Sequence, residues 1–440
     1  MRENRKLTPF EQAMENLNTL ASCFNIVTIS LIKGSLSEEV LRQTLDIIQS
    51  RHPLLNSRIV RKSNSFWFED GAEKIPLSVV NKQQIKQWEE VVIEELNQKI
   101  NSDQNLLRIT LINFEEAENI CYLIATIHHA IADAASFIQL HSEILTNCQK
   151  IAEGKTETNV TPLPQLPSIY KLMPKSFQGF TGKISNILYL LRLKIQSSQY
   201  KAITLNFEKS VPIESRSCGM VYRKLDSELT TELVKICRQQ KTTVQGALGA
   251  AMLFAVAKKT SNFQTQDIYF SFQSSVNLRS AARLRRKHLQ HKTSNEHLGL
   301  MASVIPTFHH LKKNESFWDL AQDIKQKLET GITRGDAFRN ILVSEKIIGY
   351  LIKNPYKSMN TAGLTNIGRI NIPHDYGQFQ LEEISFILSQ AVFGGMFAAA
   401  VSTFRGKMLL NFMFSEPSIS RSTAETLADD MISIITNVCS

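Results

Sequence analysis

The chain has 440 residues, of which 43% are hydrophobic and 21% are charged. These fractions are typical of globular proteins and exclude disorder as the dominant state, and at about 150 residues per domain the length favours two or three domains. The formal net charge of +9 favours acidic partners such as phosphates, acidic carrier proteins or anionic lipid, without selecting one of them.

The first half of the chain alternates between helical and strand patterns. Thr8 and Pro9 mark a helix start, as the capping residue and the first helical residue. Ser37 caps a second helix, which His52-Pro53 ends. The other elements predicted in this half are a strand at 24–32, a hairpin at 59–68, a helix at 83–100, strands at 106–114 and 120–127, and a helix at 134–152.

A proline-rich stretch at 155–174 separates this pattern from the second half. A basic helix at 182–201 follows, and we expect its apolar face to cover the interface between two lobes, with a position on a membrane surface as the alternative. Helix and strand patterns then resume, with strands at 221–225, 268–272, 298–307, 386–401 and 408–414, and helices at 226–240, 243–259, 317–331 and 420–438.

These patterns predict an α+β fold with two lobes and mixed sheets. The expected division is an N-terminal lobe at 1–154, a linker and interface helix at 155–214, and a C-terminal lobe at 215–440.

The cysteines and the hydropathy pattern indicate where the protein works. The six cysteines are scattered, form no CxxC pair and lie near no histidine at metal-site spacing, so we expect reduced core thiols and no bound metal. No apolar segment follows the polar N-terminus, and the longest apolar stretches, 244–257 and 391–401, are too short to span a bilayer. We therefore expect a soluble, cytoplasmic protein.

The most informative segment is His128-His129-Ala130-Ile131-Ala132-Asp133, between a predicted strand and a predicted helix. A histidine side chain has a pKa near 6.5 and can accept a proton at neutral pH, and a helix N-terminus offers backbone N–H groups to a developing oxyanion. Two histidines satisfied by hydrogen bonds at a strand end, with Asp133 as a helix N-cap, explain the same residues without catalysis. The residues alone leave both interpretations open.

The segment resembles the HHxxxD signature of the superfamily that contains condensation domains and chloramphenicol acetyltransferase. The resemblance extends along the chain through Arg51-His52-Pro53-Leu54-Leu55, Ser275-Val276-Asn277-Leu278-Arg279 and Asn366-Ile367-Gly368-Arg369. It is strongest to stand-alone, polyketide-associated acyltransferases of the mycocerosyl transferase type and to alcohol acetyltransferases. The DFGWG motif of the plant BAHD branch is absent.

The resemblance implies two chloramphenicol-acetyltransferase-like lobes in a V shape with a channel between them. It implies that His129 is the general base, His128 supports the loop, and Asp133 orients the motif by pairing with Arg279. Ala134 stands where the family usually has glycine, so we expect a narrowed site there, and Asn366 is a second candidate for substrate binding.

A basic run is a candidate docking surface. No acidic residue occurs between Asp267 and Glu296, and the stretch includes Arg283, Arg285, Arg286 and Lys287. Such a run can attract an acidic carrier protein or the phosphates of coenzyme A, although a solvated loop is the simpler interpretation. No nucleic-acid recognition module accompanies it, so we expect no nucleic-acid partner.

The resemblance therefore predicts a monomeric, ester-forming acyltransferase that holds no cofactor. Its donor would be an acyl thioester of coenzyme A or of a phosphopantetheinylated acyl carrier protein or polyketide synthase carrier domain. Its acceptor would be a hydroxyl of a lipid, polyketide or other secondary metabolite. Amide formation in nonribosomal peptide assembly and a catalytically idle binding protein are the alternatives.

Overall fold

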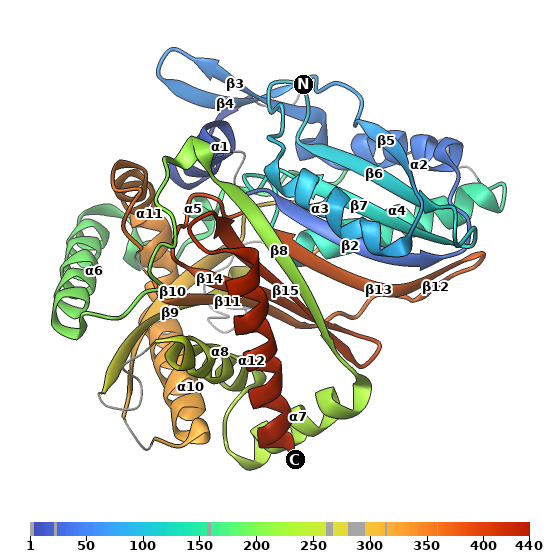
Figure 1. Cartoon of the computed structure of the whole chain (residues 1–440). Coiled ribbons are helices and arrows are strands. Elements are labelled where there is room, and N and C mark those ends of the chain that lie inside the picture. Colours follow the sequence, from blue (N-terminus) through green and yellow to red (C-terminus); the bar gives the residue numbers. More distant parts are fainter. Residues whose placement is uncertain are drawn as a thin grey trace. The chain divides into compact units, whose positions relative to one another are not determined.

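Two six-stranded mixed sheets organise the chain in this computed structural model, which describes residues 4–21, 24–155, 160–260, 267–279, 295–312, 315–358 and 360–440 (Figure 1). Each sheet belongs to one of two compact units. Unit 1 comprises Met1–Leu172, Leu289–Met301 and Arg369–Ser389, and unit 2 comprises Met173–His288, Ala302–Gly368 and Gln390–Ser440.

The sheet of unit 1 is antiparallel except for one parallel pair at its edge. Across the sheet its strands are β12 (Asp375–Tyr376), β13 (Phe379–Leu388), β2 (Ile26–Lys33), β7 (Ile120–Ile127), β6 (Leu107–Phe114) and β5 (Leu77–Lys82). A smaller sheet contains β1 (Arg5–Lys6), β4 (Ser65–Asp70) and β3 (Ser57–Lys62). The helices are α1 (Pro9–Ala21), α2 (Glu38–Arg51), η1 (Pro53–Asn56), η2 (Ile85–Gln87), α3 (Trp88–Asn97), α4 (Ala134–Ala152) and α5 (Ile169–Leu172).

The sheet of unit 2 is also mixed, because one of its strand pairs is parallel. Across the sheet its strands are β10 (Ala302–Leu311), β9 (Ile268–Asn277), β11 (Ala362–Arg369), β14 (Phe397–Phe404), β15 (Lys407–Glu416) and β8 (Ser217–Leu225). The helices are η3 (Lys175–Phe177), α6 (Gly179–Tyr200), η4 (Ile213–Ser215), α7 (Ser227–Gln239), α8 (Val244–Lys259), α10 (Phe317–Arg334), α11 (Asp336–Lys353) and α12 (Arg421–Cys439). The predicted α+β fold with mixed sheets is confirmed.

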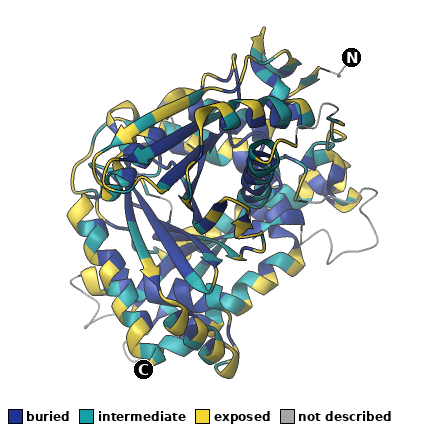
Figure 2. Ribbon diagram, turned by 90° about the vertical axis from the view of Figure 1, so that its right-hand side faces the viewer, coloured by how far each residue is buried: buried dark blue, intermediate teal, exposed yellow. Residues whose placement is uncertain are grey.

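The central strands are buried on both faces, which explains their continuous apolar sequences (dark blue in Figure 2). In unit 2 the core includes Phe270, Phe272 and Phe412, all with no exposed surface. Helix α8 contributes small residues that allow close packing. A Cβ atom at Gly246 would lie 2.4 Å from the carbonyl oxygen of Ala321 on α10, so glycine permits this approach of the two helices.

The units are discontinuous in sequence, whereas the sequence predicted contiguous lobes. Strand β13 pairs with β2 from Gln380 opposite Lys33 to Leu388 opposite Ile26, which places a late segment of the chain in unit 1. The single strand predicted at 386–401 is therefore wrong: β13 and β14 belong to different sheets, and residues 389–396 connect them. The predicted linker is also divided, since unit 2 begins at Met173.

Two helices differ from the sequence prediction. The helix predicted at 83–100 is shorter, because α3 begins at Trp88 after a 3₁₀ turn and ends at Asn97. Helix α11 was not predicted at all, and it begins directly after Gly335, whose φ of 82° ends α10. Among the described helices, none combines the length and the apolar character needed to cross a membrane.

Candidate active site

The HHxxxD segment forms the turn between β7 and α4 in unit 1. Asp133 is the N-cap of α4, and the backbone N–H of Ser136 donates to its Oδ1 atom over 2.8 Å. The backbone N–H of Met301 donates to the Oδ2 atom over 3.2 Å. The N-cap interpretation of Asp133 is thus confirmed, and its carboxylate fixes the start of the helix that follows His129.

The contacts of His129 select one protonation state of its ring. The Nδ1 atom lies 2.8 Å from the carbonyl oxygen of Ala132. Because a carbonyl oxygen can only accept a hydrogen bond, Nδ1 carries the proton and Nε2 presents its lone pair. Burial lowers the pKa of His129, and the Ala132 carbonyl and the Asp133 charge oppose this effect only in part. The ring is therefore a neutral base.

His128 has a different environment. Its Nδ1 atom accepts a hydrogen bond from the backbone N–H of Ala130 over 3.1 Å, and its Nε2 atom lies 2.8 Å from the carboxylate of Glu15 on α1. The hydroxyl of Ser102 donates to the other oxygen of Glu15 over 2.8 Å. His128 is thus hydrogen-bonded at Nδ1 and in close contact with a carboxylate at Nε2, which ties the turn to α1.

Phe24 is a site residue that the sequence analysis missed. Its ring stacks on that of His129, with a centroid distance of 5.5 Å and an interplanar angle of 23°. Its φ of 67° is left-handed, which is unfavourable for a bulky residue. The backbone is held in place by Ser389, whose carbonyl accepts from the Phe24 N–H over 2.9 Å and whose N–H donates to the Asn25 carbonyl over 3.1 Å. No sequence signal reveals the position of Phe24, because the backbone hydrogen bonds that hold it come from Ser389, 365 positions away in the chain.

The Arg51-His52 motif contacts the same helix, α4. Both side chains contact the carboxylate of Glu143 on α4, at 2.6 Å from Arg51 Nε and 3.0 Å from His52 Nε2. The motif therefore links the end of α2 to α4, and its contribution is structural.

Arg279 lies in unit 2 and is 2% exposed. Its backbone N–H donates to the side-chain oxygen of Asn277 over 2.9 Å, which shapes the chain just after β9. Asp133 belongs to unit 1, and the pairing of Asp133 with Arg279 stays a prediction.

Ala134 and Asn366 are the two residues that the sequence analysis named as candidates for substrate contact. Ala134 is the half-buried first residue of α4. Asn366 lies on β11, and its side-chain oxygen accepts from the Gly368 N–H over 2.8 Å, so it stabilises its own turn. Substrate contacts of both stay predictions. The docking candidates Arg283, Arg285, Arg286 and Lys287 lie outside the described residues.

Other reactive side chains are buried structural groups. His309 is fully buried within β10, where its Nδ1 atom lies 2.7 Å from Asp323. Burial raises the pKa of the Cys121 and Cys148 thiols to about 12, which leaves no thiolate there at neutral pH. In the described ranges, no three His, Cys, Asp or Glu side chains cluster as metal ligands would.

Solved structures share this fold over nearly the whole chain. Polyketide synthase associated protein 5 from Mycobacterium tuberculosis is 15% identical, with a TM-score of 0.69 and coverage of 99% of this chain and 97% of its own. Trichothecene 15-O-acetyltransferase TRI3 from Fusarium sporotrichioides is 12% identical, with a TM-score of 0.75 and coverage of 98% and 95%. The condensation domain of the monacolin K polyketide synthase MokA is 12% identical, with a TM-score of 0.69 and coverage of 100% and 98%.

Two sequence comparisons give different results, one with individual proteins and one with a family model. A search of curated protein sequences gives no match. The family model of the condensation domain, in contrast, matches residues 12–440, which is nearly the entire chain. On this evidence the chain belongs to the condensation domain family.

Proposed function

We propose that the protein is an acyltransferase that moves an acyl group from a thioester to a hydroxyl acceptor, with His129 as the general base. The observation that carries this proposal is the tautomer of His129. Its Nδ1 proton is held by the Ala132 carbonyl, and burial keeps the ring neutral, so Nε2 can take a proton at neutral pH.

In the proposed reaction, Nε2 removes the proton of the acceptor hydroxyl while its oxygen attacks the thioester carbonyl carbon. A C–O bond forms, and the carbonyl electrons move to oxygen in a tetrahedral intermediate. The intermediate collapses as the C–S bond breaks, and the imidazolium returns its proton to the departing thiolate sulfur. The reaction is balanced without an acyl-enzyme, so neither a serine nor a cysteine nucleophile is required.

The surrounding residues position the base in this proposal. Phe24 limits the rotation of the imidazole ring, and the Asp133 cap fixes the turn that carries it. A base held in one rotamer loses less entropy at the transition state than a mobile one. His128 holds the turn from the other side through Glu15 and is not itself the base.

The donor would be an acyl thioester of coenzyme A or of a phosphopantetheinylated carrier protein, which binds as a substrate, so no resident cofactor is required. The acceptor would be the hydroxyl of a lipid, polyketide or other secondary metabolite. The family match equally supports amide formation as a second candidate, since condensation domains give the family its name. The similarity of Asn366-Ile367-Gly368-Arg369 to alcohol acetyltransferases favours the ester.

Product analysis tests this assignment. The purified chain is incubated with a panel of acyl thioesters and with matched acceptors that differ only in carrying a hydroxyl or an amine. Mass spectrometry should detect esters formed with release of free thiol, and the His129→Ala variant should form both far more slowly. Amides formed from the amine acceptors in the absence of esters would favour the second candidate. Thiol release without transfer to any acceptor would contradict both.

A second experiment tests whether the basic run binds an acyl carrier protein. We expect the fourfold charge reversal Arg283→Glu, Arg285→Glu, Arg286→Glu and Lys287→Glu to raise the KM for a carrier-bound donor at low salt, because acidic carriers are steered by basic surfaces. The kcat should change little. An N-acetylcysteamine thioester has no charge to steer and serves as the control donor. Equal KM values for the carrier-bound donor in both proteins would remove this run from the docking surface.

A further inference from the structure

Helix α6 has its polar side inward and its apolar side outward. Six of the ten most exposed large hydrophobic side chains among the described residues lie on this helix. They are Phe180, Ile184, Ile187, Leu188, Leu191 and Ile195. Phe180 is 78%, Leu188 60% and Ile195 62% exposed, whereas the position of this helix over an interface between lobes stays a prediction.

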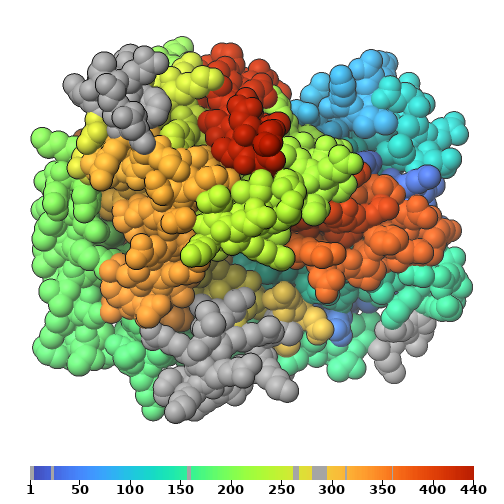
Figure 3. Space-filling view, turned by 90° about the horizontal axis from the view of Figure 1, so that it is seen from below, coloured from blue at the N-terminus to red at the C-terminus, as the bar shows by residue number. Residues whose placement is uncertain are grey.

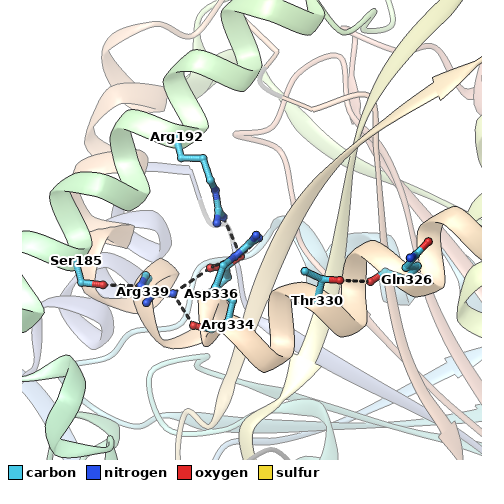
Figure 4. Close-up of polar contacts among 7 residues, drawn as sticks. All are labelled: Ser185, Arg192, Gln326, Thr330, Arg334, Asp336 and Arg339. Atoms are coloured by element: carbon cyan, nitrogen blue, oxygen red, sulfur yellow. Dashed lines mark hydrogen bonds and ion pairs between the residues drawn. The ribbon is translucent and has the colours of Figure 1, made fainter.

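The inward side of α6 is held by polar contacts with α11, the helix beside it in unit 2 (Figures 1 and 4). Arg192 forms a 2.8 Å ion pair with Asp336, a carboxylate that is 1% exposed at the start of α11. Arg339 donates from Nε to the Ser185 hydroxyl over 2.8 Å and also contacts Asp336. Tyr189 is buried on the same side, with the Arg192 guanidinium 5.2 Å from its ring centroid.

These contacts fix the rotation of the helix. Ser185, Tyr189 and Arg192 are three or four residues apart and therefore share one face of α6. Turning the apolar face inward would break the ion pair of Arg192 with Asp336 and the hydrogen bond of Ser185 with Arg339, although Asp336 would keep Arg334 and Arg339 as partners. The outward position of the apolar residues is thus built into the packing.

The exposed residues form a continuous stripe. At about 100° per residue, the six apolar side chains occupy a sector of roughly 100°, and Lys183 and Lys194 lie along one edge of it. Figure 3 shows α6 (green) along the margin of the face in view. The charge along this part of the sequence has one sign. From residue 158 to residue 207 the sequence contains no acidic residue and six basic ones: Lys171, Lys175, Lys183, Arg192, Lys194 and Lys201.

We propose that the outer face of α6 binds the surface of an anionic lipid bilayer, with the apolar stripe in the headgroup region and the flanking lysines on lipid phosphates. An apolar face beside basic residues is the pattern of helices that lie in the plane of the membrane interface. The charge distribution argues against a second copy of this chain as the occupant. In a two-fold contact through the stripe with the two helices antiparallel, the lysines of both copies would lie on the same side of the contact and repel. This site is independent of the proposed acyl transfer.

Vesicle sedimentation of the full chain tests the proposal. We expect binding to phosphatidylcholine–phosphatidylglycerol vesicles and much weaker binding to pure phosphatidylcholine. The double substitution Leu188→Ser/Ile195→Ser should weaken binding at least about tenfold by removing inserted surface. The charge reversal Lys183→Glu/Lys194→Glu should weaken it by about tenfold and make it less dependent on salt than binding of the wild type. The matched control Leu20→Ser/Val79→Ser removes exposed apolar residues elsewhere and should bind like the wild type.

Three results would overturn the proposal. They are no binding of the wild type to anionic vesicles, equal binding to anionic and neutral vesicles, and equal loss of binding in the control variant. Light scattering distinguishes the competing occupant. A dimer that Leu188→Ser/Ile195→Ser converts to a monomer, together with no vesicle binding, would identify the stripe as a contact between copies. Unchanged unfolding midpoints show that each variant is folded.

Discussion

Asp133 allows a sharp test of how the turn bearing His129 is held. In the substitution Asp133→Ala, α4 loses its N-cap and the backbone N–H of Met301 loses an acceptor in a buried position. Asp133→Asn keeps an oxygen that can accept from Ser136, and asparagine caps helices about as well as aspartate. The two variants therefore separate the cap from the rest of the carboxylate.

The expected loss can be worked out from these contacts. Removing an N-cap costs about 0.5–2 kcal/mol. Leaving a buried N–H without a partner costs about 1–3 kcal/mol. Together, the contacts within unit 1 predict a loss of about 1.5–5 kcal/mol in the free energy of unfolding for Asp133→Ala. For Asp133→Asn we expect a clearly smaller loss, because the cap remains.

Tryptophan fluorescence can report on unit 1 alone. The chain has three tryptophans, Trp67 and Trp88 in unit 1 and Trp318 in unit 2, so a Trp318→Phe background confines the signal to unit 1. Urea unfolding in this background measures both variants against the parent. Equal losses for Asp133→Ala and Asp133→Asn, or a loss below about 1 kcal/mol for alanine, would refute the capping argument.

Three further predictions concern the same unit and its predicted partner. Burial lowers the pKa of His141 to about 3, so below about pH 6.5 the unfolded chain takes up a proton that the folded chain does not. The His141→Leu variant should therefore gain stability relative to the wild type as the pH falls from 6.5, by up to about 5 kcal/mol near pH 3. A stability difference in urea unfolding that does not vary with pH would contradict this. Phe24→Ala should lower kcat/KM about tenfold by freeing the His129 ring. The acid limb of the pH profile of kcat/KM should move to higher pH, because a less buried His129 has a higher pKa. An unchanged pH–rate profile would exclude this role of Phe24. In a double-mutant cycle, Asp133→Ala and Arg279→Ala should be less than additive if the two side chains pair, whereas full additivity would reject the pair.

The sequence predicted those helix ends and strands that are determined by residues close together in the chain. Thr8-Pro9 and Ser37 marked helix starts that the structure has, and the strand before His128 and the helix after Asp133 lie where their patterns placed them. The turn between them could therefore be located as a candidate site from the residues alone. Its assignment to a family came from the resemblance, which the family model supports.

Long-range contacts determine what the sequence could not reveal. Strand β13 lies beside β2 because eight pairs of residues match along the ladder, and such a register has no local signal. Phe24 reaches His129 through a clamp formed by Ser389. In α6, the spacing of apolar residues predicted a common face, but the contact of the opposite face with Asp336, 144 positions after Arg192, has no local signal.

The most direct test of the proposed mechanism is the turnover of His129→Ala with a donor and acceptor that the wild type uses. Loss of a positioned general base should lower kcat by about 10²–10⁴-fold while the unfolding midpoint stays near that of the wild type. The companion variant His128→Ala should lose less turnover and more stability, since it unties the turn from Glu15. In the wild type, the acid limb of kcat/KM should lie below pH 6.5, because burial lowers the pKa of His129 and the neutral ring is the active form. Near-wild-type turnover by His129→Ala would contradict the account.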